Sequence, residues 1–109
     1  MQITTEQFTQ AVEKWIDNDL ANKGSIWQKG LLVFIVNQGK TKLESMLSSL
    51  QLLADEQGRF EVSSLHKNMK LALDKMGSKV TIPLINYTFD EVDLSKIFNY
   101  IEEDYGQSN

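Results

Sequence analysis

Apolar residues recur at helical spacing along most of the chain, which predicts a mainly α-helical fold. The first helix is expected over residues 5–22, behind a capping box in which Thr4 and Gln7 satisfy each other's backbone N–H groups. Three more helices are expected: one over about residues 41–54, one capped by Ser63 or Ser64 and ended by Gly77, and a last one capped by Asp93. The apolar positions expected to face the core are Phe8, Ala11, Val12, Trp15, Ile16 and Leu20, then Leu43, Met46, Leu47, Leu50 and Ala54, then Leu65, Met69, Ala72, Leu73 and Met76, and finally Leu94, Ile97, Phe98, Ile101 and Tyr105.

The segment from residue 25 to residue 37 is harder to assign because it is apolar on every side. Trp27, Leu31 and Phe34 fit one face of a helix, but the run 31–36 would be apolar all round, as in a fully buried helix. The same run is rich in β-branched residues and also fits a buried strand. The pattern favours a fifth helix, with the strand as the open alternative.

Alternating apolar residues predict short strands in the second half of the chain. A turn at residues 55–58 leads into the alternating stretch around Phe60 and Val62. Residues 80–84 and 87–89 are typical of a hairpin, and Pro83 favours an edge position for the first of its strands. The expected fold is therefore mainly α (α+β), with about five helices and a short β-hairpin or small antiparallel sheet in the C-terminal half.

Length and composition indicate one folded domain. Leu, Ile, Val and Phe make up about 29% of the 109 residues, well above the roughly 20% below which chains stay disordered. We expect a single domain over residues 1–109, with a possible seam at 55–58 between a helical first half and a mixed second half. There is no cysteine, no leader-like segment and no long apolar run, which favours a soluble cytoplasmic protein without a membrane segment.

Two segments resemble ligand-binding loops but lack residues that such loops need. Residues 39–41 (Gly-Lys-Thr) resemble the end of a phosphate-binding loop, yet the glycine required five residues before the last glycine is replaced by Phe34. Residues 53–64 resemble a calcium loop around its central glycine. Leu53 and Ser64 stand where the two anchoring carboxylates belong. We expect neither a phosphate nor a calcium site.

The remaining polar residues do not form a catalytic pattern. His66 is the only histidine, and the nearby Ser63 and Ser64 are too close in sequence to align with it for proton transfer. Most carboxylates cluster at helix ends, where they complement helix dipoles. Asp19 is the exception, because it falls within the apolar stripe of the first helix and is expected to reach solvent or to meet a lysine across an interface. We therefore expect no catalytic residue, no cofactor and no metal site, and not an enzyme.

Charge is spread in alternating acidic and basic blocks, with a net charge of −4 and a pI of about 4.9. Such blocks are compatible with self-association, whereas the acidic balance disfavours nucleic acid as the main partner. One basic block holds a possible contact for nucleic acid or another polyanion, formed by Lys67, Lys70, Lys75 and Lys79. The order of elements around it partly resembles a winged helix, in which the helix before the hairpin enters the major groove.

The leading functional hypothesis is a small non-enzymatic module for protein–protein interaction, assembly or regulation. The partner is expected to be another protein or a second copy, with a homo-oligomer favoured, and Trp27, Leu31 and Phe34 are the candidate self-association residues. This compact, cysteine-free character suits accessory proteins such as those of phages and mobile elements. The alternative is a winged-helix-like nucleic-acid-binding protein.

Overall fold

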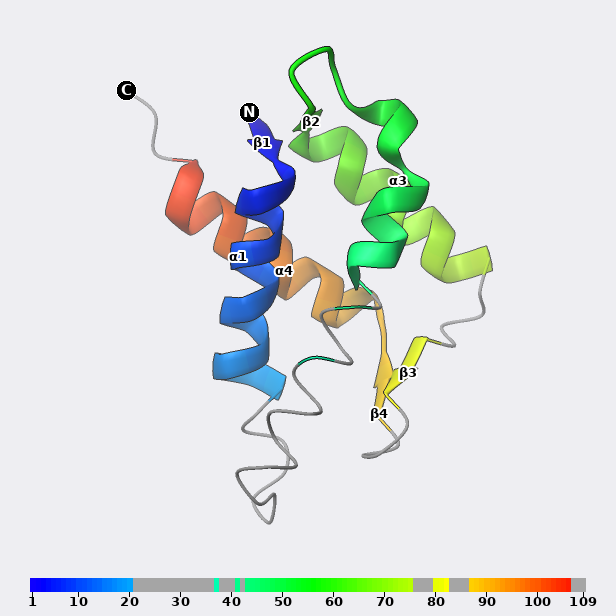
Figure 1. The fold of residues 1–109 in the computed structure, drawn as a ribbon. Helices are drawn as coiled ribbons and strands as arrows, with labels where there is room; N and C mark the ends of the chain where they lie inside the picture. The colour runs from blue at the N-terminus through cyan, green and yellow to red at the C-terminus, as the bar shows by residue number, and fades with distance from the viewer. Residues whose placement is uncertain (21–36, 38–40, 42, 76–79, 83–86, 107–109) are drawn as a thin grey trace.

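The computed structural model describes residues 1–20, 37, 41, 43–75, 80–82 and 87–106 (Figure 1). The described part of the chain is mainly helical. Its elements are, in order, β1 (Gln2–Thr4), α1 (Thr5–Trp15), the π-helix η1 (Ile16–Leu20), a helix at residues 43–49, the 3-10 helix η3 (Gln51–Leu53), β2 (Arg59–Glu61), α3 (Val62–Lys75), β3 (Val80–Ile82), β4 (Tyr87–Phe89) and α4 (Glu91–Tyr105).

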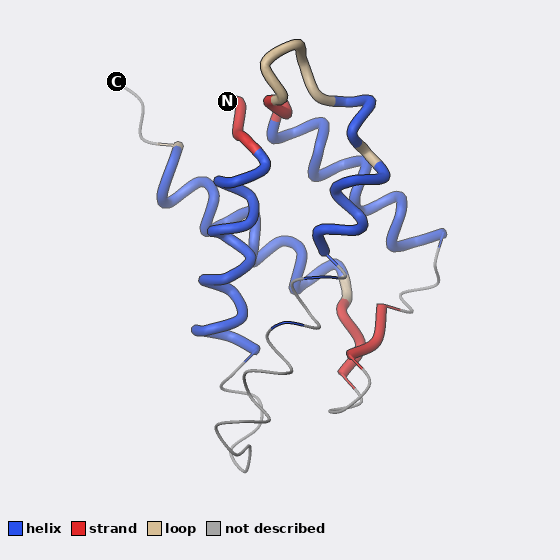
Figure 2. The backbone as a smooth tube through the Cα atoms, viewed as in Figure 1, coloured by secondary structure: helices blue, strands red, loops and turns tan. Residues whose placement is uncertain are grey.

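Helix α4 is the central element of the helical part. It packs against α1 on one side and against α3 on the other. In Figure 1, α1 crosses in front of α4, and the 43–49 helix lies in front of α3. Figure 2 shows that the two small sheets lie apart, with helices between them. No helix among the described residues is long and apolar enough to cross a membrane.

The predicted helix starts are confirmed in one case and corrected in two. The capping box before α1 is present, with Thr4 Oγ1 accepting from Gln7 N and Gln7 Oε1 accepting from Thr4 N. Helix α3 begins at Val62, so neither Ser63 nor Ser64 caps it. The expected cap Asp93 is also wrong. It occupies the third helical position, and Asp90 is the N-cap, because two acidic residues three apart both fit a capping box.

The small sheets differ from the expected position. The hairpin of β3 and β4 is confirmed, with Val80 opposite Phe89 in antiparallel register. A second two-stranded sheet joins β1 to β2, so sheet structure is not confined to the C-terminal half. In this sheet the buried Ile3 lies opposite the buried Phe60. Three residues are too few for alternation to reveal β1 in the sequence, and its pairing depends on a partner far along the chain.

The number of helices also differs from expectation. Four α-helices are present among the described residues, at α1, 43–49, α3 and α4, where about five were expected. The expected fifth helix at residues 25–37 lies outside the described residues apart from Asn37. The expected helix over 41–54 is shorter, because the chain changes to the 3-10 helix η3 after Leu50.

The chain reverses direction between η3 and β2 in a turn that the side chain of Asp55 stabilises. Asp55 Oδ1 accepts hydrogen bonds from the backbone N of Gln57 and of Arg59, both at 2.9 Å. Gly58 has a φ of +75°, a conformation that glycine adopts without strain. The predicted turn at residues 55–58 is therefore confirmed.

The buried residues follow the predicted helical faces closely. They form one cluster that draws on α1, the 43–49 helix, β1, β2, α3, β4 and α4. Two aromatic contacts tie α1 into it, Phe8 with Phe98 at 6.2 Å and Trp15 edge-on to Phe89 at 5.4 Å between ring centroids. The members are Ile3, Phe8, Ala11, Val12, Trp15, Ile16, Leu43, Met46, Leu47, Phe60, Val62, Leu65, Met69, Leu73, Phe89, Leu94, Ile97, Phe98 and Ile101.

The N-cap of α4 gives a first prediction. Asp90 Oδ1 accepts from the backbone N of Val92 at 3.0 Å and of Asp93 at 3.1 Å. Asp90→Ala leaves both donors without this acceptor and should lower the free energy of unfolding by about 0.5–2 kcal/mol, measured by urea denaturation. Asp90→Asn keeps a capping oxygen and should retain most of the stability. Equal unfolding midpoints for Asp90→Ala and the unaltered protein would contradict the assignment.

Candidate functional site: the groove between α3 and α4

A groove lies along the line where α3 and α4 meet. It consists of two hollows of about 390 Å³ and about 310 Å³, which adjoin because His66 and Ser95 line both. The larger hollow extends to Glu61 and Glu102, and the smaller one to Val92. The two hollows together form one elongated, open site.

Helical spacing explains why these side chains share the groove. On α3, His66 and Lys70 are four residues apart and therefore lie one above the other on the side facing α4. On α4, Glu91, Ser95 and Asn99 follow the same spacing. The buried stripes of both helices point to the core, so these polar residues are left along the outer edge of the contact.

An aromatic pair forms one wall of the groove. The imidazole of His66 stacks on the ring of Phe98, with 4.3 Å between the ring centroids and 7° between the planes. Burial, and secondly the positive charge of Lys70, lower the pKa of His66 from its ordinary value. The imidazole is therefore neutral at pH 7, where it offers one hydrogen-bond donor and one acceptor to a ligand.

The polar groups that line the larger hollow include a serine hydroxyl and carboxylates. Ser63 Oγ donates to Glu61 Oε1 at 3.4 Å, so the described contacts of this hydroxyl are not with the imidazole. No group of three His, Cys, Asp or Glu side chains among the described residues is placed to hold a metal ion. What the groove presents is a row of hydrogen-bonding side chains beside an aromatic wall.

The structure describes three of the four lysines that the sequence indicated as a possible contact for nucleic acid or another polyanion. Lys67, Lys70 and Lys75 are exposed on α3, while Lys79 lies outside the described residues. Lys70 Nζ lies 3.5 Å from Glu91 Oε2, so this lysine is already paired across the groove. Lys67 and Lys75 make no ion pair with the described part of the chain. The self-association candidates Trp27, Leu31 and Phe34 all lie outside the described residues.

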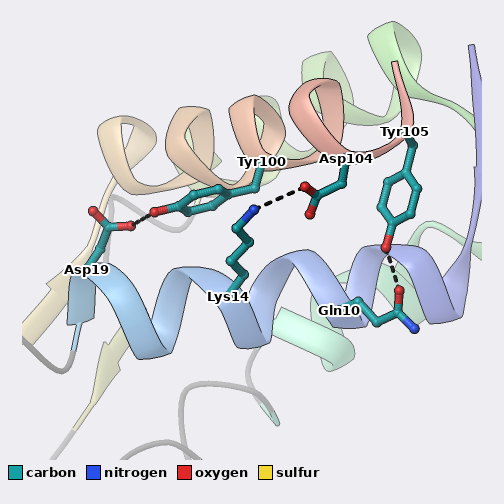
Figure 3. Close-up of polar contacts among 6 residues, drawn as sticks. All are labelled: Gln10, Lys14, Asp19, Tyr100, Asp104 and Tyr105. Atoms are coloured by element: carbon teal, nitrogen blue, oxygen red, sulfur yellow. Dashed lines mark hydrogen bonds and ion pairs between the residues drawn. The ribbon is translucent and has the colours of Figure 1, made fainter. Parts of the chain in front are cut away.

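Asp19, the unusual carboxylate of the first helix, lies in a polar seam between α1 and α4 (Figure 3). Its Oδ2 accepts from Tyr100 Oη at 2.6 Å, and its Oδ1 lies 3.9 Å from Lys96 Nζ. Asp19 therefore meets a lysine of its own chain, whereas the lysine expected from the sequence lay across an interface. The hydrogen bond to Asp19, followed by burial, raises the pKa of Tyr100, so the phenol keeps its proton.

Two further contacts continue this seam toward the end of α4. Lys14 Nζ lies 3.0 Å from Asp104 Oδ1 and 5.0 Å from the centre of the Tyr100 ring. Tyr105 Oη donates to Gln10 Oε1. The three hydrogen-bonded pairs of the seam are Asp19–Tyr100, Lys14–Asp104 and Gln10–Tyr105, and in each pair the two residues face each other across packed helices (Figure 3). The seam therefore helps to hold these helices together.

The sequence indicated the lysines of α3 as a possible contact surface, but it gave His66 no binding role and did not reveal the α4 side of the groove. Ser95, Phe98 and Glu102 gave no signal of their own, since a serine and an acid on a helix are ordinary solvent-facing residues. Phe98 was expected in the core, where it indeed lies, but it also lines the larger hollow. The polar spacing of Glu91, Ser95 and Asn99 was the one available clue.

Comparisons with protein-family models, with curated proteins and with solved structures returned no match.

The stacked histidine gives a prediction for pH dependence. The pKa of His66 is lowered in the folded state, so the unfolded chain takes up a proton first as the pH falls through about 6.5. The contribution of His66 to stability should be complete above that pH and should decline below it. Urea midpoints measured at about pH 7.5 and about pH 5.5 should therefore decrease toward the acid side.

His66→Phe is the matched control, because a phenyl ring can retain the stack but cannot titrate. Its midpoints should fall less over the same interval than those of the unaltered protein. An identical fall in both proteins would show that other groups cause the pH dependence.

Proposed function

We propose that this protein is a non-enzymatic module for protein–protein interaction, in assembly or regulation, and that the α3–α4 groove is its binding surface. The observation that carries the proposal is the groove itself, an elongated open site with hydrogen-bonding side chains along an aromatic wall. Grooves between packed helices commonly receive a helix or peptide segment of a partner. Polar groups then fix its orientation, while apolar contacts supply much of the affinity.

The surroundings of the groove support a protein partner. Val92 is 58% exposed at one end of the groove, and Met1 is 41% exposed at the other. The charged side chains Glu61, Glu102 and Lys70 are distributed around it rather than converging on a point. Apolar contacts within a polar rim are the usual anatomy of a protein-binding surface.

A matched pair of substitutions tests the proposal. Ser95 lines both hollows, so Ser95→Arg fills the groove with a long side chain, whereas Ser48→Arg makes the same change at an exposed position on the 43–49 helix. The tagged protein is recovered from its native host and co-purifying proteins are identified. Binding of each purified candidate is then measured by calorimetry. The Ser48→Arg variant should bind normally, and Ser95→Arg at least about tenfold more weakly.

Two results would overturn the proposal. Equal binding by both variants would remove the groove as the binding surface. If no co-purifying protein binds directly to the unaltered protein, and the protein does not bind a second copy of itself either, the interaction function itself is lost. Circular dichroism of both variants checks that their helices are intact.

Nucleic-acid binding is the second candidate function. It is favoured by Lys67 and Lys75, two exposed lysines on α3 without an ion pair to any described residue. It is weakened by the topology, because β2, the strand before α3, pairs with β1 and not with the β3–β4 hairpin. The order of elements still matches a winged helix in one respect, because the helix before the hairpin reads the DNA there and α3 precedes the β3–β4 hairpin here.

A gel-shift assay at low salt tests this alternative. If α3 contacts phosphates, the protein should bind a DNA or RNA duplex, and Lys67→Glu with Lys75→Glu should reduce affinity at least about tenfold. Absence of binding by the unaltered protein at low salt would dispose of the alternative, because salt screening is weakest there.

A further inference from the structure

The last turn of α4 is acidic, although the carboxyl end of a helix favours positive charge. Glu102, Glu103 and Asp104 all lie in this turn, and the turn contains no basic residue. The helix dipole places partial negative charge at this end, so each of these carboxylates is unfavourable there unless a cation lies close to it. An arrangement that breaks a local rule in this way requires compensation from elsewhere.

Two of the three carboxylates have a lysine of the chain in their surroundings. Asp104 Oδ1 lies 3.0 Å from Lys14 Nζ. Glu103 lines a small hollow of about 180 Å³ together with Lys96. Glu102, by contrast, makes no ion pair with any residue that the structure describes. Its carboxylate is therefore the one in this turn that a cation from a partner can compensate.

Glu102 lines the larger hollow of the groove, with neutral hydrogen-bonding groups beside it. Ser95, Asn99 and Glu102 are spaced by four and three residues and therefore follow one face of α4. No lysine or arginine is among the described residues that line this hollow. The N-terminal ammonium of Met1, which also lies there, is 3.4 Å from Glu61 Oε1 and is thus engaged by that carboxylate. The hollow therefore offers one uncompensated carboxylate together with a hydroxyl and an amide oxygen.

We propose that the larger hollow receives an arginine side chain of the partner protein, with the guanidinium group at Glu102. The inference rests on the protein-binding function proposed above and names the chemistry that the groove recognises. A guanidinium group carries five N–H donors and a permanent positive charge, which suits a carboxylate flanked by other oxygen acceptors. An ammonium group offers three donors from a single point, and a neutral side chain leaves the charge of Glu102 uncompensated.

The aromatic wall of the hollow favours arginine over lysine. His66 and Phe98 line the hollow as a pair of stacked rings. Arginine stacks its planar guanidinium group on aromatic rings and packs its methylene groups against apolar surface. Because the pKa of His66 is lowered, its imidazole is neutral at pH 7 and does not repel a cation. The volume of about 390 Å³ also lies within the roughly 300–1,000 Å³ that is typical of ligand-binding pockets.

A blocked alanine pentapeptide with a central arginine tests the proposal without the natural partner. Its binding to the full chain is followed by the movement of backbone amide signals in NMR spectra at up to about 50 mM peptide, because a single side chain binds in the millimolar range. The amide signals of Ser95, Asn99 and Glu102 should move with one common dissociation constant. The same peptide with lysine, or with citrulline, which has the shape of arginine without its charge, should bind at least about threefold more weakly.

Glu102→Gln and Glu103→Gln form a matched pair of variants. They remove the same charge at adjacent positions, but Glu102 lines the larger hollow and Glu103 lines another one. Glu102→Gln should raise the dissociation constant of the arginine peptide about threefold or more, whereas Glu103→Gln should bind it as the unaltered protein does. Each variant removes an unfavourable charge from the end of α4, so both should keep the helix folded.

Three results would overturn the arginine site: no saturable movement of signals with the arginine peptide, equal binding of the lysine or citrulline peptide, or equal effects of the two variants. Each of them would leave the interaction function standing, because that function is decided by whether Ser95→Arg loses the natural partner. Conversely, an arginine peptide that binds at Glu102 while Ser95→Arg retains the partner would support the site and overturn the proposed function. The two failures are therefore distinguishable.

Discussion

The packing of α1 on α4 is the contact on which the rest of the fold depends. It joins the buried stripe of α1, which includes Phe8 and Trp15, to that of α4, which includes Phe98. Helix α4 also packs along α3, and the groove follows that contact. Phe98 contributes to both contacts, touching Phe8 within the core and stacking on His66 at the groove wall.

Much of the fold could be predicted because periodicity and capping act locally. The inner faces of α1, α3 and α4 are confirmed nearly residue by residue, and so is the Thr4–Gln7 capping box. The predictions failed where two residues fit the same local role, or where a strand depends on a pairing partner that is distant in the sequence. Asp90 and Asp93 both fit a capping position, and β1 is only recognisable through its pairing with β2.

The candidate site was much less predictable than the fold. The sequence indicated the lysines of α3, of which Lys70 lines the groove, but a groove exists only once two helices lie beside each other. Glu91 illustrates the difficulty. It was interpreted as a complement to the dipole of its helix, and in the structure it also lies 3.5 Å from Lys70 across the groove. Neither of the two sequence segments, taken alone, indicates that these residues form an ion pair.

The seam between α1 and α4 also has a consequence for how the chain folds. Its three side-chain links join residues 81, 90 and 95 positions apart, and β1 likewise pairs only with the distant β2. Contacts of such long range delay folding, because a large loop must close before they contribute. During synthesis on the ribosome, Phe8 therefore lacks its contact with Phe98 until α4 has emerged. A nascent chain of this protein should be at its most aggregation-prone in that interval.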